Sequence, residues 1–285
     1  MTDSPSPPPS DSSATTAGFQ QQVRSGDRFE FGRNWQAFLT TLDDERIARA
    51  EQSLRDMLRV ESLESRRFLD IGSGSGLFSL AARRLGATVH SFDFDPQSVA
   101  CAEELRNRYF AGDDRWTIER GSVLDARYVE SLGPFDIVYS WGVLHHTGDM
   151  WLALENAAKA VGDAGQLFIA IYNQQGYKSR WWLRVKQIYC SGLAGRALIC
   201  ALFVPYFWAT TAAASVVLRR NLFAERKKDR GMSIWHDWID WLGGLPFEVA
   251  RPEEIFDFYR DRGFELQSLK TTNGLGNNEF VFGRR

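Results

Sequence analysis

The spacing of hydrophobic residues changes along the chain, and each change marks a predicted element. Residues 34–60 carry apolar side chains such as Trp35, Phe38 and Leu42 at three- and four-residue intervals, which predicts amphipathic helix. From Arg66 onward, short β-rich runs alternate with helical ones. The expected strands span residues 68–71, 88–92, 116–119, 135–139 and 166–172, and the expected helices span residues 77–85, 97–107 and 150–161. This alternation predicts βαβ units and therefore a parallel sheet covered by helices.

The last part of the chain predicts two more strands. Residues 265–269 and 279–283 are β-rich and flank the polar, glycine-containing stretch 271–278, which is typical of a hairpin turn. The sequence thus predicts an α/β fold with a doubly wound sheet. The expected organisation is a disordered Ser- and Pro-rich tail (1–17), a helical cover (18–60), an α/β core (61–173), a helical insertion (174–250), and a C-terminal helix and hairpin that complete the sheet (251–285).

The insertion contains the most apolar segment of the chain. Residues 197–218 include no Asp, Glu, Lys or Arg, and they are flanked by Arg196 and by Arg219 and Arg220. The segment reaches the roughly 18 to 20 residues that a membrane span needs. A span would however separate the C-terminal hairpin from the sheet, and Pro205 predicts a bend. Three alternatives stay open: a buried or lid helix, a contact with one membrane surface, and a true span.

Composition and charge narrow the class of protein. A net charge of −2 and a pI of about 6.1 lack the basic footprint of general nucleic-acid binders. Cys101, Cys190 and Cys200 are too scattered for a disulfide framework or a zinc site, so we expect free thiols and no metal. The first residues lack the order of a secretion signal. We therefore expect a cytoplasmic protein, with the inner face of a membrane as the alternative.

The sharpest chemical signal follows the first expected strand. The run from Phe68 to Gly76 reads Phe-Leu-Asp-Ile-Gly-Ser-Gly-Ser-Gly, a strand that enters a glycine loop and then a helix. Gly72 and Gly74, with Ser73 between them, permit a tight turn whose backbone N–H groups approach a ligand, and Gly76 permits close strand-to-helix packing. Such a loop binds a polar ligand at a helix N-terminus.

An acidic residue ends the second expected strand. Asp93 can accept hydrogen bonds from both hydroxyls of a ribose, and Phe94 can flank an adenine. A dinucleotide oxidoreductase is the alternative, because glycine loops also bind pyrophosphate. The pattern here is Asp-x-Gly-x-Gly-x-Gly rather than Gly-x-Gly-x-x-Gly. Asp70, before the first glycine, would repel a pyrophosphate but suits a cationic sulfonium and amino group.

Over residues 66–172 these motifs resemble the class I S-adenosylmethionine-dependent methyltransferases. The resemblance implies S-adenosyl-L-methionine as the cofactor, bound by the core at 61–173, and a seven-stranded Rossmann-like sheet with an antiparallel last strand. The residues that it implies for the cofactor are Asp70, Gly72 and Gly74 on the methionine side, Asp93 at the ribose, and Ser122 and Val123 beside the adenine. The adenine-side acid frequent in this family is Ser122 here, which leaves Asp125 as a substitute.

Within that family, residues 135–146 most resemble the ubiquinone-type and small-molecule methylases. This run reads Phe-Asp-Ile-Val-Tyr-Ser-Trp-Gly-Val-Leu-His-His, and Ser140 to Val143 occupy the position of the (Asp/Asn)-Pro-Pro-(Tyr/Phe) box of amino-group methylation. The box is absent, which disfavours methylation of a base nitrogen.

Two places in the sequence offer a general base. His145 and His146 follow the fourth strand at the edge where ligands bind in such sheets, and His145 is the preferred candidate. The structural alternative is that both hold the loop by hydrogen bonds or that His146 caps the next helix. His236, beside Asp237, is the second candidate, because an adjacent carboxylate can orient a histidine; a structural pairing within the insertion is its alternative.

The insertion leaves the carboxyl end of the fifth strand, so we expect it to roof the acceptor pocket. Its tryptophans favour a lipophilic acceptor, although tryptophan is more often a core residue; they are Trp181, Trp182, Trp208, Trp235, Trp238 and Trp241. Polar residues of the last turn are placed either to reach the substrate or only to satisfy the turn; they are Thr271, Thr272, Asn273, Asn277 and Asn278.

The leading interpretation is an enzyme that methylates an oxygen of a lipophilic or glycan-linked small molecule. Its expected partners are that small-molecule acceptor and no nucleic acid. The alternatives are methylation of a carbon of a quinol-like ring, a cofactor-binding protein without catalysis, and a membrane-surface protein in which residues 197–218 are the main functional element.

Overall fold

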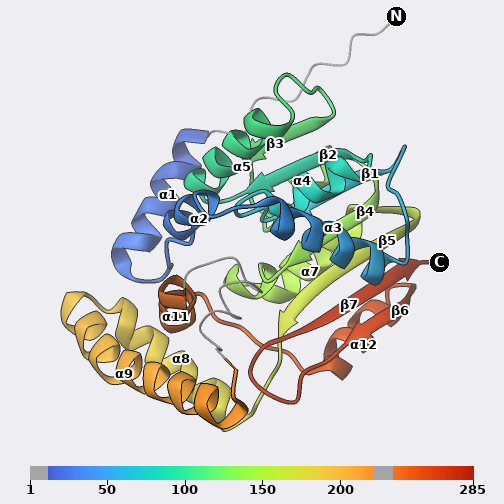
Figure 1. Ribbon diagram of the computed structural model, residues 1–285. Helices are drawn as coiled ribbons and strands as arrows, with labels where there is room; N and C mark the ends of the chain where they lie inside the picture. Colours follow the sequence, from blue (N-terminus) through green and yellow to red (C-terminus); the bar gives the residue numbers. More distant parts are fainter. Residues whose placement is uncertain (1–11, 221–233) are drawn as a thin grey trace, which may run out of the picture.

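A seven-stranded sheet forms the centre of the protein (Figure 1). The computed structural model describes residues 12–220 and 234–285. The strands are β1 (Arg67–Ile71), β2 (Thr88–Asp93), β3 (Trp116–Arg120), β4 (Phe135–Trp141), β5 (Val161–Tyr172), β6 (Phe264–Lys270) and β7 (Asn277–Arg284). Their order is β3-β2-β1-β4-β5-β7-β6, and β7 runs antiparallel to both of its neighbours. The expected doubly wound sheet with an antiparallel last strand is confirmed.

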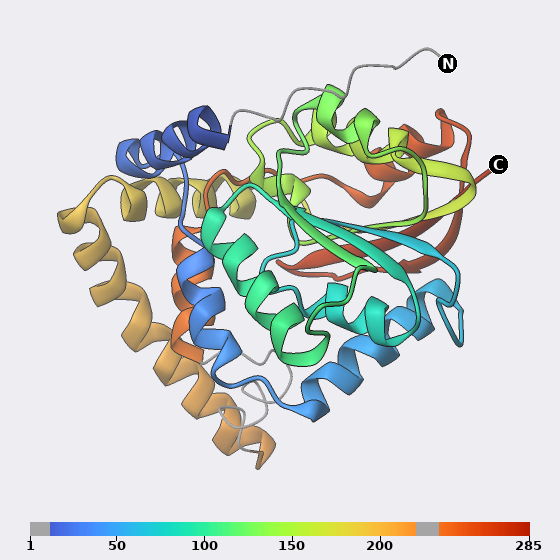
Figure 2. The ribbon, with the colours of Figure 1, turned by 90° about the horizontal axis from the view of Figure 1, so that it is seen from above.

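Helices cover both faces of the sheet, as the view from above shows (Figure 2). One layer consists of α3 (Asp44–Leu58), α4 (Leu77–Arg84) and α5 (Pro96–Tyr109), and the other of α6 (Ala126–Ser131), α7 (Met150–Lys159) and α12 (Pro252–Arg260). Because successive strand residues point to opposite faces, Phe168 packs in the first layer and Leu167 in the second. Each layer therefore has its own continuous apolar core.

The N-terminal cover differs from its prediction in two ways. Residues 12–17, expected to be disordered, begin α1 (Ser12–Ser25), which is anchored because Phe19 is buried against the ring of Phe94; residues 1–11 lie outside the described part of the chain. The helical pattern at 34–60 forms two helices, α2 (Gly32–Leu39) and α3. They separate because the Asp43 side chain accepts a hydrogen bond from the Arg46 N–H (2.9 Å) and so caps a new helix.

The insertion forms three described helices beside the sheet. They are α8 (Tyr177–Cys190), α9 (Leu193–Leu218) and α11 (Ile234–Gly243). The first two pack as a hairpin around a separate apolar cluster that includes Trp182, Tyr189 and Ile199. In Figure 1 this hairpin lies along one side of the molecule, with α11 between it and the sheet.

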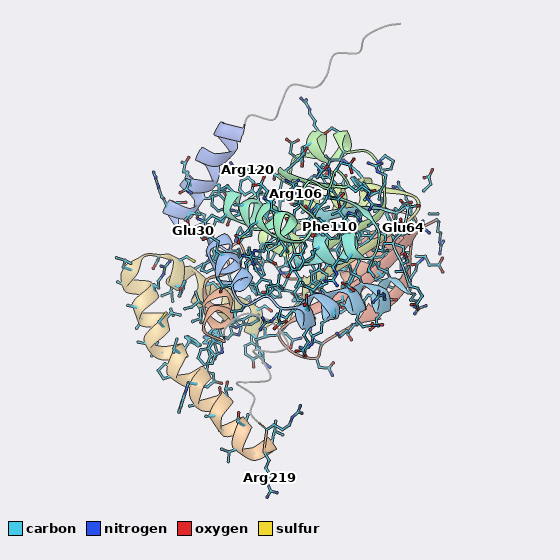
Figure 3. The ribbon with its side chains drawn as sticks, turned by 45° about the horizontal axis from the view of Figure 1, so that its top comes forward. Glu30, Glu64, Arg106, Phe110, Arg120 and Arg219 are labelled. Atoms are coloured by element: carbon cyan, nitrogen blue, oxygen red, sulfur yellow. The ribbon has the colours of Figure 1, made fainter. Side chains whose placement is uncertain are left out.

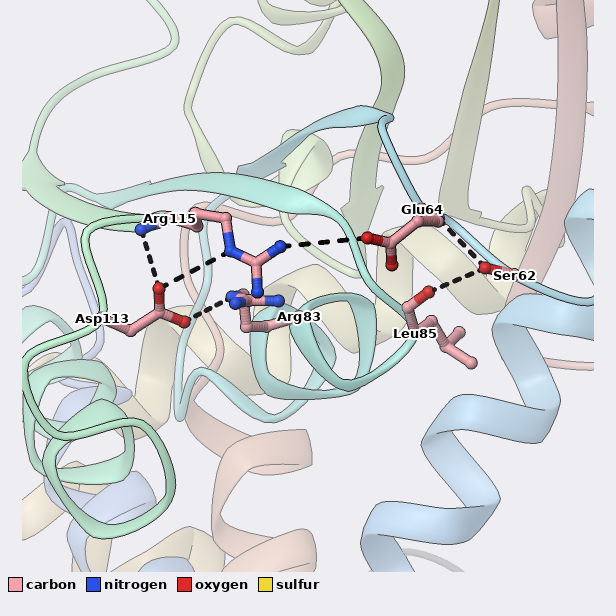
Figure 4. Close-up of polar contacts among 6 residues, drawn as sticks. All are labelled: Ser62, Glu64, Arg83, Leu85, Asp113 and Arg115. Carbon is pink, nitrogen blue, oxygen red and sulfur yellow. Dashed lines mark hydrogen bonds and ion pairs between the residues drawn. The ribbon is translucent and has the colours of Figure 1, made fainter.

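A polar cluster ties the turn before β3 to helix α4 (Figure 4). The Asp113 carboxylate pairs with Arg83 at 2.5 Å and accepts a hydrogen bond from the Arg115 N–H at 2.9 Å. The Arg115 guanidinium in turn lies 4.0 Å from Glu64. The side chains of Arg83 and Asp113 are only 4% and 12% exposed, so this pair is held away from water. It fixes the edge of the sheet remote from the insertion.

Candidate active site

A cavity of about 1160 Å³ opens at the carboxyl ends of strands β1 to β5. The segments that follow these strands meet there, as expected for an open parallel sheet. They contribute Gly72, Asp93, Ser122, Gly142 and Tyr172 to its wall. This volume exceeds what a single drug-sized ligand occupies, so the cavity has room for a cofactor and an acceptor side by side.

The glycine loop after β1 adopts the turn that its sequence requires. Gly72 has φ +75° and Gly74 has φ +55°, which are left-handed conformations that favour glycine. A Cβ on Gly72 would lie 2.3 Å from Val143, and one on Gly74 would lie 3.0 Å from Trp35. The loop is thus packed from two sides, and neither position has room for a side chain. The packing predicted for Gly76 is instead against helix α5, where a Cβ would lie 2.9 Å from the backbone of Ala102.

Two carboxylates lie at this loop. The Asp93 carboxylate accepts hydrogen bonds from the N–H groups of Gly74 (2.9 Å) and Asp95 (2.8 Å), and it lines the cavity. Asp70 is buried and accepts a hydrogen bond from the Ser79 hydroxyl (2.6 Å). Burial raises the pKa of Asp70 to about 7 and the pKa of Asp93 to about 6, partly offset by these hydrogen bonds. A cation bound beside them would stabilise both in their charged form.

Phe94 forms the floor of the neighbouring part of the cavity. Its ring lies 5.0 Å from the Arg28 guanidinium and 5.7 Å from the ring of Phe19, so α1 and the following segment close over it. Burial lowers the pKa of Arg28, an effect that Asp93 and Asp95 oppose. Phe19 and Arg28 were missed by sequence reasoning, because both precede the recognisable motifs and no spacing marks them.

Ser122 and Val123 lie where the adenine end is expected. Both line the cavity, and the carbonyl of Val123 is fixed by a hydrogen bond from the Asn156 amide (2.9 Å). Asp125 does not replace the missing acid, because it is exposed and accepts a hydrogen bond from the Tyr128 N–H as the cap of α6. The position beside the expected adenine therefore carries the hydroxyl of Ser122 and no carboxylate.

These residues fit S-adenosylmethionine, and a buried hydroxyl that lacks a hydrogen-bond partner supports the same ligand. The hydroxyl of Ser73 is buried without a hydrogen-bond partner among the described residues, and it lines the cavity. Together with the glycine turn and two carboxylates, it offers polar groups to a ligand that carries a cationic centre and hydroxyls. The predicted cofactor residues are thus brought together at one edge of the sheet.

The two adjacent histidines have different surroundings. His145 is fully buried, its Nδ1 accepts a hydrogen bond from the Tyr172 N–H (3.4 Å), and it is not among the residues that line the cavity. Burial lowers the pKa of His145 well below its usual value, with His146 and Lys186 adding to the effect. The preferred candidate base is therefore placed inside the core rather than at the acceptor.

His146 does line the cavity. Its Nδ1 lies 2.5 Å from the carbonyl oxygen of Pro246, so Nδ1 carries the proton and Nε2 keeps a lone pair. Burial, followed by Lys186, lowers the pKa of His146 to about 3. The ring is consequently neutral at physiological pH and offers one fixed hydrogen-bond acceptor. His236 lies in α11, but its side chain is outside the described part of the chain, so its role stays a prediction.

His146 belongs to a wall that we name the acceptor wall: His146, Tyr172, Trp241, Leu275 and Asn277. The Tyr172 ring contacts those of His146 (5.3 Å) and Trp241 (5.8 Å). The Asn277 amide has a buried oxygen without a hydrogen-bond partner among the described residues. The wall is thus aromatic, with two polar groups set into it.

Most residues expected in the roof lie elsewhere. Trp241 lines the cavity, whereas Trp182 and Trp238 pack inside the insertion, and Trp181 and Trp208 are exposed; the side chain of Trp235 is outside the described residues. In the last turn, Asn277 lines the cavity, while the Asn278 oxygen accepts a hydrogen bond from the Thr272 N–H (3.1 Å) and stabilises the turn. Asn278 therefore satisfies the turn, whereas Asn277 is placed at the cavity, where its contact with a substrate stays a prediction.

The strand order, the glycine loop and the paired carboxylates define a class I S-adenosylmethionine-dependent methyltransferase. A family model described as a methyltransferase domain matches residues 42–201, more than half of the chain. The protein therefore belongs to this methyltransferase family, and the predicted cofactor, S-adenosylmethionine, is confirmed with it.

Individual proteins similar to this chain are also methyltransferases. The ubiquinone biosynthesis O-methyltransferase of Rhizobium etli is 31% identical over 120 residues, which is 42% of this chain and 46% of that protein. The protein of the same name from a Caulobacter species is 30% identical over 137 residues, 48% of this chain and 51% of that protein. The matches thus span about half the length of these relatives.

Among solved structures, the fold is similar to the magnesium protoporphyrin IX methyltransferase of Synechocystis with bound S-adenosylhomocysteine. The TM-score is 0.51 at 13% sequence identity, with 95% of this chain and 96% of that chain covered. The same enzyme with bound S-adenosylmethionine gives a TM-score of 0.51 at 11% identity, with 99% and 100% covered. At these identities the likeness shows the fold.

Proposed function

We propose that this protein transfers a methyl group from S-adenosylmethionine to a hydroxyl oxygen of a lipophilic small molecule. The observation that carries the proposal is the acceptor wall, where His146 and Asn277 are polar groups among aromatic and aliphatic side chains. An aromatic wall favours an apolar or ring-shaped acceptor. The relatives are O-methyltransferases of ubiquinone biosynthesis, which supports the same class of acceptor.

The residues of this chain have three tasks in such a reaction. When bound, the cofactor supplies an electrophilic methyl group on a sulfonium. The glycine loop, Asp70 and Asp93 position the cofactor, and the acceptor wall excludes water from the acceptor. The Asn277 amide oxygen accepts a hydrogen bond from a second donor on the acceptor, such as a neighbouring hydroxyl, and His146 Nε2 accepts the proton of the hydroxyl that is methylated. The lowered pKa of His146 keeps this nitrogen unprotonated before the reaction but also makes it a weak base, so the proton moves only as the methyl–oxygen bond forms and the hydroxyl becomes acidic.

The test compares variants on hydroxylated aromatic acceptors with and without a prenyl tail. We expect methylation on oxygen and better use of the tailed acceptor. His146→Gln should lower kcat by about 100-fold or more, since a positioned base contributes that much, and should leave cofactor affinity unchanged. Asn277→Leu should mainly raise KM, because it removes a hydrogen bond in the bound ground state.

The matched control is His90→Gln, since His90 lies on β2 outside the cavity wall, with its Nε2 3.4 Å from Glu119. It should retain full activity. A product methylated on carbon or nitrogen, or full activity in His146→Gln, would contradict the proposed reaction.

A further inference from the structure

The outward face of the α8–α9 hairpin is apolar and exposed to an unusual degree. On α9, Leu202 is 59% exposed, Trp208 is 61% exposed and Val217 is 79% exposed. On α8, Tyr177 and Trp181 lie one turn apart and are 71% and 49% exposed. By length and composition α9 qualifies to cross a membrane, and only 11% of its most apolar stretch is buried. Contiguous apolar surface of this kind marks an interaction site.

One stripe of α9 is nevertheless covered by protein. Ile199, Phe203, Phe207 and Thr211 follow one another at four-residue intervals and face inward. The Phe207 ring lies 5.6 Å from that of Trp238 in α11, and the Phe203 ring lies 5.5 Å from that of Trp182 in α8. A helix that packs against the protein from Ile199 to Thr211 is not surrounded by lipid on that side, which argues against a span. Its other faces carry the exposed apolar side chains, and the helix is about 39 Å long for 26 residues.

The charge around this face has one sign. Residues 174–220 contain seven Lys and Arg residues, of which Lys186 is buried, and no Asp or Glu, although the whole chain has a net charge of −2. Exposed cations stand at both ends of α9, Arg196 in its first turn and Arg219 just after its last residue, and Figure 3 shows Arg219 at the far end of the helix. Two copies of this face would bring like charges together, whereas an anionic lipid surface complements them.

We propose that the outward face of α8 and α9 docks into one leaflet of an anionic lipid bilayer, with α9 lying in the plane of the membrane. The exposed aromatic residues Trp181, Tyr206 and Trp208 suit the boundary between headgroups and acyl chains. The aliphatic residues between them enter the acyl region, and the arginines at the helix ends contact lipid phosphates. This orientation places the exposed apolar residues of the hairpin in lipid without separating the hairpin from the sheet.

The docked hairpin also sets the cavity beside the membrane, a step that rests on the proposed function. Trp241 and Leu275 of the acceptor wall pack against the same apolar cluster as Phe203 and Phe207 of α9. A lipophilic acceptor dissolved in the leaflet then reaches the cavity through apolar surroundings. The site would thus act on membrane-dissolved molecules.

Vesicle flotation of the full chain, without cofactor or acceptor, tests the docking. The wild-type protein should float with phosphatidylcholine vesicles that contain phosphatidylglycerol, and less with phosphatidylcholine alone. The double variant Leu202→Asp/Trp208→Asp should remain unbound, because it places charges in the acyl region. Arg219→Gln/Arg220→Gln should lower the partition coefficient on anionic vesicles by about 25-fold, about 5-fold per charge.

Leu269→Asp is the matched control, since Leu269 is 49% exposed but lies on β6, away from the hairpin. It should float like the wild type, and each variant should keep its S-adenosylmethionine affinity as a check of folding. Should the aspartate variant not fold, the arginine pair alone decides the outcome. Wild-type protein that stays unbound, or variants that float equally well, would overturn the docking. A wild-type dimer that the aspartates split, without vesicle binding, would assign the face to a second copy instead. None of these readouts depends on turnover, so failure of the proposed reaction is seen separately.

Discussion

Asp93 is the residue on which the cofactor site most depends. Its carboxylate is held by two backbone N–H groups and lines the cavity. Asp93→Ala should weaken S-adenosylmethionine binding by about 1–3 kcal/mol, because a charge-assisted hydrogen-bond pair to the ribose is lost. Calorimetric titration measures this loss, with Asp257→Ala on the exposed side of α12 as the control. Unchanged affinity of the Asp93 variant would show that the ribose binds elsewhere.

Asp70 and Asp93 also make binding depend on pH. Burial raises their pKa values to about 7 and about 6, so both protonate in the free protein as pH falls through this range. A cationic ligand favours the charged carboxylates, so affinity should fall below pH 7 and binding should release protons between pH 6 and pH 7. Titrations in buffers of different ionisation enthalpy detect the released protons. Affinity that stays constant from about pH 8 to about pH 5 would contradict the coupling.

The difference between His145 and His146 was not accessible from the sequence. Both follow β4 within one 3₁₀ turn, Leu144–His146, and the sequence analysis preferred His145 without a geometric reason that separates it from His146. The turn places His145 against Tyr172 in the core and His146 beside the cavity. In contrast, Asp70 and Asp93 were predictable, because a carboxylate at the end of a strand beside a glycine loop has few other uses. The contact of Trp35 with the glycine loop was not predicted, because the sequence indicated only that Trp35 belongs to an amphipathic helix.

Among the elements, the turn before β3 carries the most testable stabilising interaction. Partial burial opposes ionisation of Asp113, but the hydrogen bonds from Arg83 and the Arg115 N–H lower its pKa. Asp113→Ala should lower the free energy of unfolding by about 3 kcal/mol, since it leaves the buried Arg83 without its partner. Denaturant unfolding measures the loss, and its pH dependence gives a second check. Because the pKa is lowered, the stabilisation is present at neutral pH and is lost as pH falls through the folded-state value.

Asp257→Ala is the control for this change too, because its ion pair with Arg260 is about half exposed and should contribute little. If Asp113→Ala and Asp257→Ala lowered the free energy of unfolding equally, the buried ion pair between Arg83 and Asp113 would not stabilise the protein more than an exposed one.

Element types were predictable where the period was regular and failed where a cap or a short helix interrupted it. The central strands follow from their β-rich runs, and β5 merely begins earlier, at Val161. Helix α6 was missed, because six residues are too few to show a helical period. The division between α2 and α3 depends on one capping side chain, Asp43, within a pattern that otherwise reads as continuous.

For the whole molecule, the sequence predicted the sheet and its ligand edge but not how the insertion closes the cavity. The order of short strands and helices determines the doubly wound topology, since such crossovers are right-handed. No comparable rule places the insertion: all six of its tryptophans were expected in the roof, and of the five whose side chains the structure describes only Trp241 reaches the cavity wall. Their placement depends on long-range packing between α8, α9 and α11.

The central claim is that the glycine loop and the two carboxylates bind S-adenosylmethionine. The most direct measurement is calorimetric titration of the purified protein with S-adenosylmethionine and, separately, with NADH. The account predicts saturable binding of S-adenosylmethionine alone, because Asp70 and Asp93 attract its cationic centre and repel a pyrophosphate. Binding of NADH without S-adenosylmethionine would contradict the assignment of this site and make the loop a dinucleotide-binding one.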